Sequence, residues 1–148
     1  MTISITKKQG QLCQYKIVRD DESTEIIDLD EQTFFLHDIT HFVVEKNLAL
    51  SKGFWGLLAE GHAFKALFGK ENQMTSELRF IEKIVGPVQS TFLGYIPKQD
   101  FARYIAYLGF KFPENILDDC LREIKDILKK WENLEMGNAL ELEWPNKL

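Results

Sequence analysis

Cysteine is scarce in this chain, and uninterrupted apolar runs are short. Only Cys13 and Cys120 occur, and neither belongs to a C-x-x-C pair. Two isolated cysteines cannot form a disulfide framework, and they do not suggest a thiolate metal or redox site. No apolar run approaches the roughly 18 residues that a membrane span needs, and the first residues lack the apolar core of a secretory signal. We therefore expect a cytoplasmic protein that does not associate with a membrane.

The chain also lacks an excess of basic residues. Its 18 lysines and arginines are outnumbered by 23 acidic residues, the net charge is -5, and no segment gathers the basic side chains. Such a chain has no basic field that would attract phosphate backbones, so we expect no nucleic-acid partner. The length of 148 residues and the 45% hydrophobic content are typical of one globular domain, which we predict to span residues 1–148.

Alternation of apolar and polar residues predicts strands in the first 30 residues. It runs through residues 2–8 and 12–19, with Gly10 between them, and the segment 24–29 continues it with Ile26 and Ile27. The alternating segment 139–144 near the other end predicts one more strand. We expect it to join the N-terminal β-meander as an antiparallel strand, which would bring the termini together.

Helical periodicity begins near residue 37 and dominates the rest of the chain. Segments 37–48, 51–64 and 75–88 are predicted helices, with Gly69 to Gln73 as a polar break and Gly86-Pro87 ending or kinking the third. A short helix follows Pro97, and a long one with a broad apolar face opens at Pro113-Glu114. The predicted fold class is α+β, with an antiparallel sheet of three or four strands packed against about five helices.

One constellation of residues could carry chemistry. His37, His41 and Glu45 fall at i, i+4 and i+8 of the predicted helix 37–48, within an arc of about 80°. Two histidines at i and i+4 are how one helix offers two ligands to a single zinc ion. Apolar residues on both sides of this helix predict that it is covered on both sides, so that its histidines are partly desolvated.

The five residues from His37 to His41 read H-D-x-x-H, an aspartate variant of the H-E-x-x-H zinc-peptidase signature. Asp38 is therefore a weak candidate for the general base, although its side chain is one methylene shorter than glutamate. Glu45 lies too far along the helix to share an ion easily and is better placed as a partner of His41. We expect a third ligand from the following segment, where His62 or Glu60 could supply it.

A likeness to known proteins covers roughly residues 15–61. The segment from His37 to Glu45, followed by Gly53-Phe54-Trp55-Gly56, resembles a family of small bacterial proteins that carry His-Asp-(Leu/Ile)-x-His-(Phe/Tyr)-x-Val-Glu and then Gly-Phe-Trp-Gly. Arg19-Asp20-Asp21 matches the strand end of that family. The resemblance implies a bacterial source and a shared fold. The family has no assigned activity, so no catalytic residue and no enzyme class are carried over.

Two hypotheses about function remain open. In the first, His37 and His41 bind a divalent metal such as zinc, or a small ligand, with Glu45 and His62 as weaker candidate ligands. In the second, the histidines are purely structural and the chain is a non-enzymatic interaction module. Its aromatic segments, Phe54-Trp55 or residues 92–112, would then supply an exposed apolar patch that contacts a protein partner or a second copy of the chain.

Overall fold

A four-stranded antiparallel sheet forms one side of the molecule. This computed structural model describes residues 1–67 and 75–145. Strands β1 (Thr2–Lys8), β2 (Leu12–Val18), β3 (Thr24–Asp30) and β4 (Ala139–Glu143) lie in the order β3-β2-β1-β4. The predicted return of the C-terminal strand to the N-terminal meander is confirmed, because β4 pairs antiparallel with β1.

The alternation in the sequence explains which face of the sheet is buried. The side chains of Ile3 and Ile5 on β1, and of Cys13, Tyr15 and Ile17 on β2, are fully buried. Their neighbours along each strand point to the opposite face, because successive side chains of a strand alternate. The last described residues return to the N-terminus as predicted, since the backbone amide of Trp144 donates to the Met1 carbonyl oxygen at 2.9 Å.

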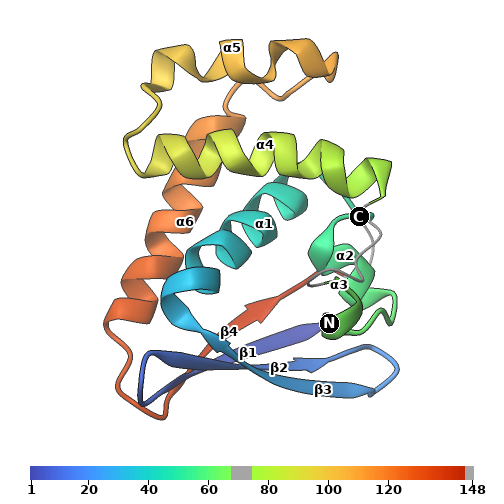
Figure 1. The fold of residues 1–148 in the computed structure, drawn as a ribbon, viewed down its shortest axis with the longest axis vertical. Coiled ribbons are helices and arrows are strands. Elements are labelled where there is room, and N and C mark those ends of the chain that lie inside the picture. The colour runs from blue at the N-terminus through green and yellow to red at the C-terminus, as the bar shows by residue number, and fades with distance from the viewer. Residues whose placement is uncertain (68–74, 146–148) are drawn as a thin grey trace.

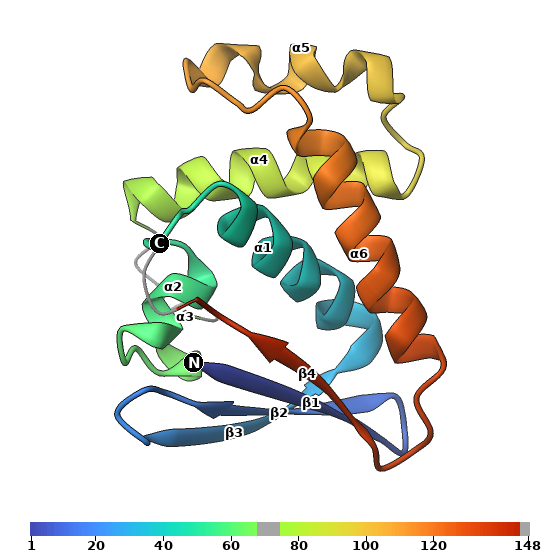
Figure 2. The same ribbon diagram turned by 180° about the vertical axis from the view of Figure 1, so that it is seen from behind.

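All the helices cover the same face of this sheet (Figures 1 and 2). Helix α1 lies next to the sheet, α4 crosses over α1, and the segment containing α5 forms the outermost layer. The predicted α+β class is thereby confirmed. No helix in the described part of the chain is long and apolar enough to cross a membrane. The helical elements are η1 (Glu31–Phe35), α1 (Leu36–Asn47), α2 (Phe54–Ala59), α3 (Phe64–Leu67), α4 (Ser76–Phe92), η2 (Lys98–Asp100), α5 (Phe101–Ile105), η3 (Ala106–Leu108) and α6 (Ile116–Glu132).

Helix α4 does not end at Gly86-Pro87 but continues to Phe92. Proline restricts the residue before it in part through a clash with that residue's Cβ, and Gly86 has none. The hydroxyl of Thr91 donates to the Pro87 carbonyl oxygen at 2.8 Å, which adds a bond in the turn after the proline. The predicted polar break from Gly69 to Gln73 lies outside the described residues.

Two glycines in the segment after α1 allow other atoms of the chain to approach their backbone closely. A Cβ on Gly53 would overlap the Glu45 carboxylate, and one on Gly56 would overlap the backbone of Ser51. Phe54 and Trp55, which follow Gly53, are buried in the core. The prediction that they form an exposed patch is therefore wrong, because this segment folds back against α1 with both rings inward.

Candidate metal centre

Helix α1 is the central element of the fold, and most of its length is enclosed by other elements. Every residue from Asp38 to Glu45 is buried. The sheet, α2, α4 and α6 surround the helix, as apolar residues on both of its sides predict (Figure 1). His41 and Glu45 therefore lie in a medium of low polarity, where unpaired polar groups are costly.

His41 is held between two carboxylates from different helices. Its Nδ1 lies 2.9 Å from Oε1 of Glu45, and its Nε2 lies 2.9 Å from Oε1 of Glu82 on α4. The His41 side chain is only 4% exposed, whereas that of Glu82 is 37% exposed. Because a carboxylate only accepts hydrogen bonds, Glu45 fixes a proton on Nδ1 and leaves Nε2 directed at Glu82.

His37 lies one turn earlier on α1 and reaches the same carboxylate. Its Nδ1 is 3.0 Å from the Gln89 side-chain oxygen, and its Nε2 is 3.8 Å from Oε2 of Glu82. Gln89 thus directs Nε2 of His37 toward Glu82, as Glu45 does for His41. The two imidazole rings meet edge to face with their centroids 4.6 Å apart.

These three side chains form a cluster with the geometry of a metal site. One ligand atom from each of His37, His41 and Glu82 lies within 4.8 Å of the other two. Zinc bonds of about 2.0 to 2.1 Å at tetrahedral angles place neighbouring ligand atoms roughly 3.3 Å apart. The observed Nε2 to carboxylate distances of 2.9 and 3.8 Å lie on either side of that value.

The charges of the cluster reinforce one another. Burial alone would lower the pKa of His41, but the hydrogen bonds and charges of Glu45 and Glu82 outweigh it and raise this pKa to about 9. The Glu82 carboxylate also raises the pKa of His37. Burial would raise the pKa of Glu82, yet its interactions with the two histidines bring it well below the ordinary value. The site therefore favours positive charge between the two carboxylates.

Comparisons with models of known protein families, with curated proteins and with solved structures found no match. The resemblance to small bacterial proteins stays a prediction. Any functional conclusion must therefore come from the geometry of the cluster itself.

Asp38 lies outside the cluster, on the part of α1 that faces β2. Its side chain is buried, and its Oδ2 atom has no hydrogen-bond partner among the described residues; the same is true of the Tyr15 hydroxyl. Burial raises the pKa of Asp38 to about 7. The neighbouring Tyr15 and the two histidines oppose this rise only in part. Asp38 does not contribute to the three converging ligand atoms, so we do not assign it the role of a base at the metal.

The residues after α2 that were expected to supply the third ligand lie elsewhere. His62 is exposed, and its backbone carbonyl accepts a hydrogen bond from Arg19 at 2.9 Å. Glu60 pairs with Lys52 at 2.6 Å. Glu82 supplies the third converging ligand atom instead. Gln89, which holds Nδ1 of His37, is a further residue of the site that the sequence did not reveal.

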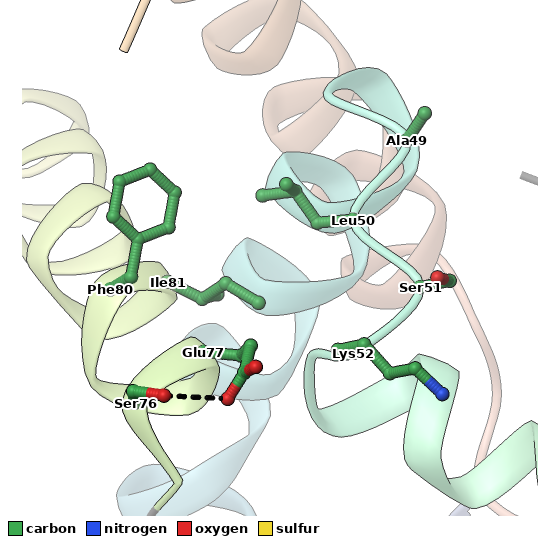
Figure 3. A pocket seen from close by; sticks show the side chains of 8 residues that line it. All are labelled: Ala49, Leu50, Ser51, Lys52, Ser76, Glu77, Phe80 and Ile81. Atoms are coloured by element: carbon green, nitrogen blue, oxygen red, sulfur yellow. Dashed lines mark hydrogen bonds between the residues drawn. The ribbon is translucent and has the colours of Figure 1, made fainter. Parts of the chain in front are cut away.

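A surface pocket of about 410 Å³ opens between the loop that follows α1 and the start of α4. Figure 3 shows Leu50 and Ile81 extending into the space between these two segments. None of the cluster residues lines this pocket. Ile81 and Glu82 are neighbours in α4, but successive residues of a helix point about 100° apart, so they lie on different faces.

Exposed aromatic side chains occur in residues 92–112, the second of the two aromatic segments. Tyr95, Tyr104, Tyr107 and Phe110 are between 39% and 79% exposed, in the outer layer that contains α5. The prediction that this region contacts a protein partner or a second copy of the chain stays open.

Proposed function

We propose that the protein binds a divalent metal ion, with zinc preferred, through Nε2 of His37, Nε2 of His41 and the carboxylate of Glu82. One observation carries this proposal: three ligand atoms from two helices converge within 4.8 Å. In addition, each histidine has its other ring nitrogen anchored, by Gln89 or by Glu45. Outer partners of this kind fix the tautomer and ring orientation of metal-binding histidines.

The donor atoms favour zinc over the hard cations. Two imidazoles and one carboxylate are typical zinc ligands, whereas calcium and magnesium prefer oxygen alone. A divalent ion would also neutralise Glu82 together with Glu45, which touches His41 from the other side. In the absence of metal, a proton on His41 Nε2 would satisfy the same two carboxylates, so that metal binding would replace a proton.

Three protein ligands leave at least one coordination position for water or a substrate. His37 and Glu82 have side chains that are 40% and 37% exposed, so the cluster opens toward solvent on their side. Structural zinc sites usually have four protein ligands, and sites with three are typical of zinc that contacts substrate or exchanges ligands. The geometry therefore supports an open metal site rather than a purely structural one.

Zinc titration of the purified chain, without a histidine tag and against a competing chelator, tests the proposal. We expect one equivalent to bind, and His37→Ala and Glu82→Ala to weaken binding by more than about 100-fold, beyond the loss typical of an outer partner. His62→Ala is the matched control, because this exposed histidine lies outside the cluster. If the chain binds no zinc, or if only His62→Ala weakens binding, the assignment of the site is wrong.

An exposed coordination position should also accept a small ligand from solution. We expect the visible spectrum of the cobalt-substituted protein to change when azide is added, because azide would replace a metal-bound water. A titration with chloride at equal ionic strength controls for salt effects. A cobalt spectrum that azide leaves unchanged would indicate that the metal is already fully coordinated.

A further inference from the structure

The Glu45 carboxylate connects the metal cluster to the first turn of α2. It is completely buried, and its Oε1 accepts hydrogen bonds from His41 Nδ1 at 2.9 Å and from the Phe54 amide at 2.8 Å. Its Oε2 accepts from the Trp55 amide at 3.0 Å. Every one of these bonds would change if Glu45 moved, so the orientation of the His41 ring depends on where the 53–55 turn lies.

The turn is itself fitted to this carboxylate. A Cβ at Gly53 would overlap both the carboxyl carbon and the oxygens of Glu45. A second link holds the turn to α1, because the indole Nε1 of Trp55 donates to the backbone carbonyl of Asp38 at 2.9 Å. The turn therefore contacts α1 near both histidines, although its residues do not belong to the cluster.

We infer that the 53–55 turn is a positioning element of the metal site: through Glu45 it sets the orientation of His41 and thereby the affinity of the cluster for metal. This inference rests on the proposed function. Replacing an outer partner of a metal-binding histidine typically reduces metal affinity 10- to 100-fold. Coupling between two sites is reciprocal, so metal bound at His41 also strengthens the contact between the turn and α1.

Zinc affinity of the Gly53→Ala variant tests this inference. The added methyl group displaces the Glu45 carboxylate, so we expect the folded variant to bind zinc 10- to 100-fold more weakly. Ile127→Ala is the matched control, because it removes a buried apolar side chain from α6, a helix that holds neither the turn nor a residue of the cluster. We expect Ile127→Ala to reduce stability and to leave the zinc affinity of the folded protein unchanged.

Two further measurements separate positioning from a general loss of stability. In the unsubstituted protein, zinc should slow hydrogen exchange at the Phe54 and Trp55 amides, and this slowing should disappear in Glu45→Asp. Glu45→Asp also serves if Gly53→Ala does not fold, because its shortened carboxylate cannot reach both His41 and the turn. Zinc binding that is equal in all variants, with no change in exchange, overturns the coupling and leaves the metal site standing. A complete absence of zinc binding in the unsubstituted chain overturns the metal site and the coupling with it.

Discussion

The His41→Ala variant is expected to bind no zinc at concentrations that saturate the unsubstituted protein. Its free energy of unfolding without metal should fall by about 3 to 5 kcal/mol, the cost of breaking a buried charged pair. The reason is the burial of Glu45, whose fully enclosed carboxylate would lose His41 and keep only the amides of Phe54 and Trp55. Urea unfolding in the presence of a chelator, followed by zinc titration of the folded variant, measures both effects.

His37→Ala provides the contrast to this variant. His37 contributes one ligand atom to the same cluster, but its side chain is 40% exposed and its ion pair with Glu82 spans 3.8 Å. Exposed pairs of this kind contribute about 0 to 1 kcal/mol, so we expect stability to change little while zinc binding is lost. Equal stability losses in the two variants would contradict the burial argument. Zinc binding retained in both would show that the histidines are structural.

The positions of the strands along the chain could be predicted from the sequence because period-2 alternation depends only on local residue order. The same holds for the relation of His37, His41 and Glu45, since a helix fixes which residues share a face. The hydrogen bond between His41 and Glu45 follows directly from that spacing. These parts of the site required no knowledge of how the helices pack.

Glu82 could not be predicted in this way. It lies 41 positions after His41, and the two meet only because α4 crosses α1 at that point. The available signal was its place at the edge of the apolar face of α4, in line with Leu78, Val85 and Gln89 at helical spacing. Such a position indicates contact with some neighbouring element but does not say which one.

Asp38 and the aromatic residues after Gly53 are residues that the sequence suggested for a functional role but that the structure places elsewhere. The H-D-x-x-H pattern placed Asp38 beside the histidines in sequence, yet one residue along a helix is a rotation of about 100°, which turns it toward the sheet. The second hypothesis placed Phe54 and Trp55 in an exposed patch, because aromatic side chains are enriched at protein interfaces. Burial of their large apolar area decided otherwise, with Trp55 completely enclosed.

The stability of the metal-free protein is expected to fall by about 3 kcal/mol between pH 6.5 and pH 9. The pKa of His41 rises from 6.5 to about 9 on folding, so its contribution is complete below pH 6.5 and is lost as the pH rises through 9. Asp38 adds a further loss of stability with rising pH, in the lower range between about pH 4 and 7, because its pKa rises from 3.8 to about 7 on folding. Glu82 acts in the opposite direction: its lowered pKa gives a contribution that is present above pH 4.5 and is lost in acid.

Urea unfolding at several pH values in the presence of a chelator measures this dependence, and His41→Ala isolates the contribution of His41. The difference in stability between the unsubstituted protein and the variant should be largest near pH 6 and should shrink as the pH rises toward 9. The buried Cys13 thiol, with its pKa raised to about 12, affects both proteins alike near the alkaline end. A difference between the two proteins that does not change with pH would contradict a protonated His41 between Glu45 and Glu82.

Saturating zinc should abolish this fall over the same range, because zinc-bound His41 has no proton on Nε2 to lose. Metal binding requires His41 Nε2 without its proton, so the stabilisation by zinc should increase as the pH rises from 6 to 8. The metal-free and zinc-bound proteins should therefore differ least in acid, where a proton already satisfies Glu45 and Glu82, and most in mild alkali. In His37→Ala, which keeps the His41 proton but lacks one ligand, the fall with rising pH should persist when zinc is added.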